Sequence, residues 1–178
     1  MIQQKINWKE RQKGKQIWRD DDIGHMTDLK KFKEVHEIFK KYKVTHTIAL
    51  ICKDIEKAPK LIDYIRKNDI SVQIHCWDHV DFKNSALTLQ EDLLNCSVAI
   101  EKHFKVAPKY VFPPWNSADE TSIGIAKELD LIMEPEKISL PQYIRTKGHV
   151  KEPVINFHYW AYEHVMLLDA ALNIYVNE

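Results

Sequence analysis

The sequence contains very little glycine and cysteine. Only four of its 178 residues are glycine, which disfavours a loop-dominated all-β fold. The three cysteines, Cys52, Cys76 and Cys96, cannot all pair within the chain, and none has the close C-x-x-C spacing of a structural zinc site. We therefore expect reduced thiols rather than a disulfide framework.

The sequence also lacks long apolar runs and an excess of one charge. No uninterrupted apolar run approaches the roughly 18 residues that cross a bilayer, and no apolar segment follows the basic residues near the start. We therefore expect neither a membrane span nor a signal peptide, and a cytoplasmic protein by default. Basic and acidic side chains both number 26, so nothing predicts nucleic-acid binding. The oligomeric state stays open.

The length and composition predict a single domain over residues 1–178. Apolar residues make up 44% of the chain and charged residues 29%, which is ordinary for a globular protein. A chain of this length can bury a full hydrophobic core without help from disulfides or metals.

The hydrophobic pattern alternates between strand-like and helix-like segments. Residues 44–52 are apolar and β-branched, which predicts a strand covered on both faces. Residues 28–42 have helical spacing, with Thr27 as the expected N-cap. We expect further helices over 56–67, 86–105 and 118–128, strands over 70–74, 110–112, 129–133 and 154–157, and a helix, or a helix running into a strand, over 162–175. The alternation predicts a single-domain α/β fold with a mostly parallel sheet. Because a complete (β/α) barrel takes about 250 residues, a shortened barrel fits the length better.

Polar side chains follow the predicted strands, where functional residues gather in α/β folds. The segment Ile17-Trp18-Arg19 leads into the run Asp20-Asp21-Asp22, which we expect to end a first strand. Adjacent carboxylates repel one another unless a cation or hydrogen-bond donors stabilise them. His75 and His79 follow the strand over 70–74 and suit zinc or a similar divalent metal if the segment turns helically. Two histidines and a carboxylate are a common catalytic metal shell. Taken alone, an exposed acidic turn and a surface histidine pair would explain the two segments.

Two later strands end in further candidates. Phe112 to Asn116 (FPPWN) contains a double proline that fixes the backbone, and Trp115 offers an apolar face on which a sugar ring could lie. A rigid connection with a packed tryptophan is the ordinary alternative. His158 follows the strand over 154–157 and brings another imidazole to the same rim.

In this order, these segments resemble the motifs of the polysaccharide deacetylases with a NodB homology domain, carbohydrate esterase family 4. Asp21-Asp22 resembles the Asp-Asp motif, and His75–His79 resembles the H-[ST]-x-x-H motif. Phe112–Trp115 resembles the R-x-P-[YW] motif, and Asn156–His158 the closing L-x-H motif. The resemblance spans roughly residues 15–160.

The resemblance implies a distorted, NodB-like (β/α) barrel that removes acetyl groups from an N-acetylated sugar or polysaccharide with the help of a divalent metal, most often zinc. It implies these roles: Asp21 as general base, His158 as general acid, Asp22, His75 and His79 as metal ligands, and Pro114, Trp115 and Asn116 at the substrate and oxyanion site.

The sequence departs from the family pattern at two positions and is ambiguous at a third. Phe112 replaces an arginine that pairs with the base, so Asp21 is expected to lack a charged partner unless Arg145 substitutes for it. Asn156 replaces a leucine that lines the acetate-methyl pocket. Asp20-Asp21 is an alternative register for the working pair. Two other functions stay open: a noncatalytic glycan-binding pseudoenzyme, favoured by the missing arginine, and a metal-dependent hydrolase of another amide or ester.

Overall fold

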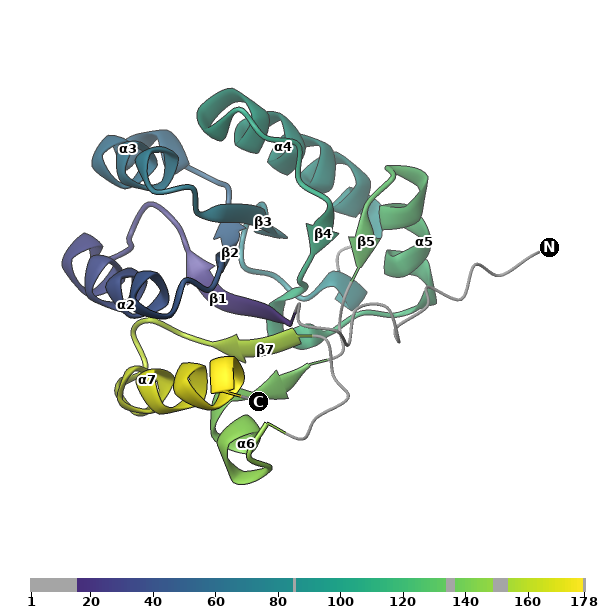
Figure 1. Ribbon diagram of the computed structural model, residues 1–178. Coiled ribbons are helices and arrows are strands. Elements are labelled where there is room, and N and C mark those ends of the chain that lie inside the picture. Colours follow the sequence, from purple (N-terminus) through teal and green to yellow (C-terminus); the bar gives the residue numbers. More distant parts are fainter. Residues whose placement is uncertain (1–15, 85, 134–136, 149–153, 178) are drawn as a thin grey trace.

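The computed structural model describes residues 16–84, 86–133, 137–148 and 154–177. Its strands are β1 (Ile17–Ile23), β2 (His46–Ile51), β3 (Ser71–Cys76), β4 (Tyr110–Val111), β5 (Ile132–Met133), β6 (Ile138–Ser139) and β7 (Val154–Phe157). They form one seven-stranded sheet in the order β5-β4-β3-β2-β1-β7-β6, and every neighbouring pair is parallel. The sheet curls into a half barrel with helices on its outer side (Figure 1), so the predicted shortened barrel is confirmed.

Helices connect the strands and cover the outside of the sheet (Figure 1). They are α2 (Leu29–Tyr42), α3 (Pro59–Lys67), α4 (Ala86–Phe104), α5 (Glu120–Glu128), α6 (Leu140–Arg145) and α7 (Tyr162–Asn177), with short 3-10 turns η1 (Ile55–Lys57), η2 (Phe82–Asn84) and η3 (Pro114–Asn116). The segment from residue 162 is helical throughout, so it does not run into a strand. The pair β6 and α6 was not predicted from the sequence. The basic segment before residue 16, and with it part of the predicted domain 1–178, lies outside the described residues.

The expected N-cap of α2 is wrong by one residue. The carboxylate of Asp28 accepts hydrogen bonds from the backbone N–H groups of Lys30 and Lys31, at 3.0 and 3.3 Å. The hydroxyl of Thr27 instead accepts a hydrogen bond from the backbone N–H of Gly24, at 2.9 Å. Thr27 therefore closes the turn after β1, and Asp28 caps the helix.

Successive side chains of β1 point to opposite faces of the sheet, as they do in any strand, and each face is covered by an apolar layer. Trp18 points toward the helices and makes edge-on ring contacts with Phe39 of α2 and Tyr143 of α6. Arg19 points into the half barrel, where its guanidinium lies over the ring of Phe112. Phe112 belongs to a small inner cluster that is separate from the main core between sheet and helices.

The alternation of β1 breaks at its carboxyl end. The pairing register with β2 shifts between Asp20 and Ile23, and Asp22 has a φ of 63°, in the left-handed region. Such a bulge changes the direction of the side chain that follows it. Without it, Asp21 and Asp22 would point to opposite faces of the sheet.

All three cysteines are free and buried, as expected. Among the described residues, no helix has both the length and the apolar character needed to cross a membrane.

Leu93 and Leu87 provide a matched test of the packing of α4. Leu93 is fully buried against the sheet, whereas Leu87 on the same helix is fully exposed. We expect Leu93→Ala to lower the free energy of unfolding by about 2–5 kcal/mol, because it leaves a cavity in the core. Leu87→Ala should change it by less than about 0.5 kcal/mol. Urea unfolding followed by circular dichroism measures both, and equal effects would contradict this packing.

Candidate functional site

The carboxyl ends of three strands bring Asp22, His75, His79 and His158 together. Oδ1 of Asp22 lies 3.2 Å from Nε2 of His75 and 3.1 Å from Nε2 of His79. Nε2 of His158 lies 3.6 Å from Oδ2 of the same carboxylate. One potential ligand atom from each of Asp22, His75 and His79 lies within 4.8 Å of the others. The three residues expected to be ligands are therefore neighbours, and metal binding by them stays a prediction.

The environment of His75 fits a metal ligand. Its Nδ1 lies 2.6 Å from the backbone carbonyl oxygen of Phe112, so Nδ1–H donates to that oxygen. This bond leaves Nε2 with a free lone pair, and Nε2 is buried without a hydrogen-bond partner. A metal-binding histidine characteristically donates its other ring N–H to a carbonyl or carboxylate in this way. A cation between Nε2 and the Asp22 carboxylate would satisfy both electron-rich groups.

The charges of the cluster favour an ionised carboxylate. Burial alone would raise the pKa of Asp22, but hydrogen bonds and positive charge from the imidazoles of His75 and His79 hold it well below its usual range. This effect needs a proton on Nε2 of His75, whereas a metal ion would need the lone pair of the same atom. The hydrogen bond to Asp22 raises the pKa of His79. Metal ligands must be deprotonated, so a cation and a proton would compete for His79.

His158 lies next to Asp22, and its backbone and ring contact His164. Its backbone N–H donates to Nδ1 of His164 at 3.0 Å, and the two rings are stacked with centroids 5.6 Å apart. Burial lowers the pKa of His158, while the carboxylates of Asp21 and Asp22 act in the opposite direction. The net shift is downward, so burial is the stronger influence.

Asp21 has a cationic partner, contrary to expectation. Nε and Nη2 of Arg19, two residues earlier on β1, donate to both of its carboxylate oxygens. The expectation was wrong because it considered only position 112 and Arg145, whereas residues two apart on a strand share a face. Asn156 also contacts this carboxylate, with Nδ2 3.3 Å from Oδ2. The side chain at position 156 therefore holds Asp21.

Asp20 lies on the other face of β1. Its Oδ1 accepts a hydrogen bond from the backbone N–H of Tyr159 at 2.8 Å, and its Oδ2 lies 3.3 Å from Nε2 of His46. Burial raises its pKa well above the usual range. His46 in turn contacts His36 through their Nδ1 atoms, at 3.3 Å. These contacts separate Asp20 from the cluster, so the geometry favours Asp21-Asp22 as the working pair.

The turn that follows β4 lies against the cluster. Pro114 is buried, whereas Trp115 is 65% exposed, with its ring centroid 4.5 Å from that of His79. Oδ1 of Asn116 accepts a hydrogen bond from Nη2 of Arg19 at 3.0 Å. Of the three residues expected at the substrate and oxyanion site, Trp115 therefore contacts the cluster, and Asn116 is linked to Asp21 through Arg19.

Two residues near the site were not identified from the sequence. Trp160 is 53% exposed, and its ring centroid lies 4.8 Å from that of His158. Its position two residues after a candidate histidine was the available signal. Lys137 is half-buried, and burial together with the nearby Arg19 lowers its pKa. No motif marked Lys137.

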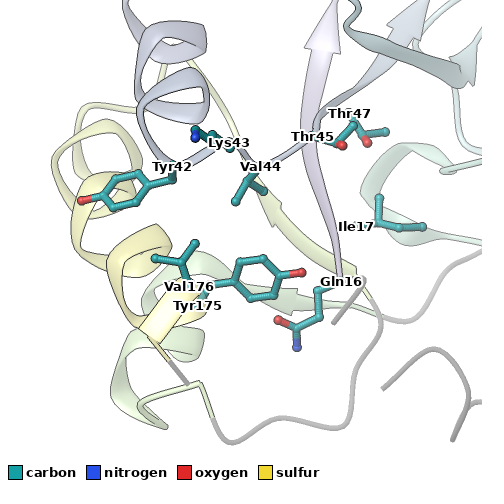
Figure 2. A pocket seen from close by; sticks show the side chains of 9 residues that line it. All are labelled: Gln16, Ile17, Tyr42, Lys43, Val44, Thr45, Thr47, Tyr175 and Val176. Carbon is teal, nitrogen blue, oxygen red and sulfur yellow. The ribbon is translucent and has the colours of Figure 1, made fainter. Parts of the chain in front are cut away.

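A separate hollow of about 600 Å³ lies where β1 begins and where α2 and α7 end (Figure 2). Among the described residues, the hollow is lined by Gln16, Ile17, Tyr42, Lys43, Val44, Thr45, Thr47, Tyr175 and Val176. This lining contains no histidine, cysteine or carboxylate, so it offers none of the side chains that make up the cluster.

Alanine variants test the ligand set. We expect His75→Ala and His79→Ala each to lower the affinity for zinc at least tenfold, because each removes an imidazole from the cluster. His103→Ala, a partly exposed histidine near the end of α4, is the matched control and should bind as the unaltered chain does. Isothermal titration with zinc and elemental analysis measure the effect. Unchanged binding by both site variants would remove these residues from the ligand set.

Solved structures share the fold. A carbohydrate esterase family 4 pseudoenzyme from Bacillus anthracis superimposes with a TM-score of 0.77 and 15% identity, covering 92% of this chain and 61% of that one. A family 4 carbohydrate esterase from Streptomyces lividans in complex with acetate gives 0.75 and 12%, covering 93% and 89%. The peptidoglycan deacetylase PdaC from Bacillus subtilis gives 0.69 and 16%, covering 92% and 83%. The chain thus spans about three fifths of the length of the Bacillus anthracis protein.

Sequence comparison identifies the family independently of the fold. No curated protein matches the chain closely enough to count as a relative. The family model for polysaccharide deacetylases matches residues 15–133, about two thirds of the sequence. This segment contains β1, β3 and the turn after β4, and therefore most of the candidate site. The chain belongs to the polysaccharide deacetylase family.

Proposed function

We propose that this protein is a metal-dependent hydrolase that removes acetyl groups from an N-acetylated sugar or polysaccharide. The observation that carries the proposal is the cluster of Asp22, His75 and His79, with Asp21 and His158 beside it, in a polysaccharide deacetylase fold. A divalent cation such as zinc, bound by the three ligands, would lower the pKa of a water molecule and polarise the acetyl carbonyl.

Asp21 is the proposed general base. Its carboxylate is buried and held by Arg19 and Asn156, so its oxygens have a fixed direction. A carboxylate fixed in this way would take a proton from a water molecule in one defined direction. Asp22, the next residue, remains available as a ligand because the bulge in β1 turns it toward the histidines.

His158 is the proposed general acid. Its Nε2 faces the Asp22 carboxylate across the cluster, while its backbone is fixed by His164. In this role it protonates the amine that leaves when the acetyl group is removed. Burial lowers the pKa of His158, and the negative charges of Asp21 and Asp22 offset part of that effect and so support the protonated imidazole that an acid needs.

The turn after β4 supplies the proposed oxyanion donor. The backbone N–H groups of Asn116 and Ser117 donate within the turn, to the carbonyl oxygens of Pro113 and Pro114, both at 2.9 Å. The donor that we propose for the oxyanion is therefore the backbone N–H of Trp115. A preorganised donor of this kind stabilises charge as it develops on the acetyl oxygen.

Two exposed tryptophans support a carbohydrate substrate. Trp115 packs against His79 and Trp160 packs against His158, and both histidines contact the same carboxylate of Asp22. Indole faces bind the apolar faces of sugar rings. The argument for a noncatalytic glycan-binding protein depended on a missing arginine, and the pairing of Arg19 with Asp21 removes that argument.

The base assignment predicts a loss of turnover without a loss of metal. We expect Asp21→Asn to reduce acetate release from N-acetylglucosamine oligomers at least about 100-fold, because the amide cannot accept the proton. Zinc content should stay at the level of the unaltered chain. Asp20→Asn is the matched control and should keep most of the activity. If Asp20→Asn were the inactive variant, the working pair would be Asp20-Asp21 instead. If the unaltered chain released acetate only from acetamides that are not sugars, the protein would be a hydrolase of another class.

The sugar-binding assignment predicts an effect on KM. We expect Trp160→Ala to raise KM for N-acetylglucosamine oligomers by about tenfold, which corresponds to about 1.4 kcal/mol of lost binding. Trp160→Phe should recover much of it, because it retains an aromatic face. Steady-state acetate release measures both variants. An unchanged KM in Trp160→Ala would exclude Trp160 from the substrate site.

A further inference from the structure

Arg19 is a fully buried cation in the interior of the half barrel. A charge in such a place is costly unless it is paired and hydrogen-bonded. Its guanidinium is paired because Nε and Nη2 donate to the two oxygens of Asp21, whereas Nη1 is buried without a hydrogen-bond partner among the described residues. A bidentate pair of this kind fixes the plane of the carboxylate as well as its position.

The same guanidinium holds a second element. Nη2 also donates to Oδ1 of Asn116 at 3.0 Å, which joins β1 to the turn after β4 across 97 residues of sequence. The guanidinium carbon lies 4.8 Å from the centroid of the Phe112 ring, and such a ring face attracts a cation. The side chain at position 112 therefore packs its aromatic face against the guanidinium of Arg19.

The turn that Arg19 holds has an unusual backbone. Trp115 and Asn116 are consecutive residues with φ values of 51° and 54°, in the left-handed region that disfavours a bulky side chain such as tryptophan. Such conformations persist where surrounding contacts impose them. The ring of His79 against Trp115 and the bond from Arg19 to Asn116 are two such contacts.

We infer that Arg19 is a positioning residue that fixes the carboxylate of Asp21 and the turn of Trp115 relative to each other. The inference rests on the proposed function, in which Asp21 is the base and Trp115 carries the oxyanion donor. One guanidinium reaches both, so the proton acceptor and the oxyanion donor keep a constant separation. Phe112 is compatible with this arrangement, because a cationic side chain at position 112 would repel the guanidinium of Arg19.

Moving the arginine from position 19 to position 112 tests the inference. We expect Arg19→Met to lower kcat at least about 100-fold with a change in KM below threefold, because misplacement of reacting groups acts on the chemical step. Phe112→Arg should also be impaired, because it brings two guanidinium groups together. The double variant Arg19→Met/Phe112→Arg should be at least tenfold more active than either single variant. Arg66→Met, an exposed arginine on α3, is the matched control.

Hydrogen–deuterium exchange of the backbone N–H groups of Trp115, Asn116 and Ser117 gives a readout that does not depend on activity. It should accelerate in Arg19→Met and in Asn116→Ala, which removes the side-chain oxygen that accepts the bond from Arg19, and stay unchanged in Arg66→Met. A folded, zinc-loaded Arg19→Met that keeps kcat within threefold, or whose turn exchanges at the unaltered rate, would overturn the inference. If Arg19→Met does not fold, Asn116→Ala decides in the same way.

The failure of the proposed function has a separate signature. An unaltered chain that binds zinc and releases no acetate from any N-acetylated sugar contradicts the function. Faster exchange of the turn in Asn116→Ala would then still support the positioning by Arg19, because that measurement involves no substrate.

Discussion

The buried pair of Arg19 and Asp21 is the constraint around which the rest of the site is arranged. A half barrel has an interior in which an unpaired charge is costly, so a carboxylate can be kept there only with a matched donor. The inner cluster is otherwise small and apolar, with Ala49, Phe112 and Val154 at its centre. Within it, the pair creates a polar position to which Asn116 and Asn156 add one hydrogen bond each, while Nη1 of Arg19 has no hydrogen-bond partner in the described part of the chain.

The three consecutive carboxylates show how one short segment takes three environments. Asp20 is buried on the helix side, where contacts with His46 and Tyr159 replace water. Asp21 is paired inside the half barrel, and Asp22 faces the histidines at the rim. The strand separates the first two carboxylates and the bulge redirects the third. Burial raises the pKa of Asp20, and the charges of Asp21 and Asp22 raise it further.

The general plan could be predicted from the sequence, because apolar runs followed by polar residues mark strand ends. The pair His75 and His79 was visible in its spacing, and the structure places it beside Asp22. The sequence favoured Asp21-Asp22 over Asp20-Asp21 as the working pair, but it did not show the bulge that redirects Asp22, because the bulge depends on pairing between β1 and β2. Arg19 was missed although its spacing from Asp21 is that of two residues on one strand face. The two-residue strand β6 is too short to produce a pattern.

An open half barrel has two free edges, which a closed barrel does not have. In the described chain these edges are β5 and β6, and each contains only two residues. Unpaired N–H and C=O groups along an edge strand are a template for association with another chain, and the risk grows with the length of the edge. Strands this short present few such groups, so in the described part of the chain the two edges offer little template for pairing with another chain.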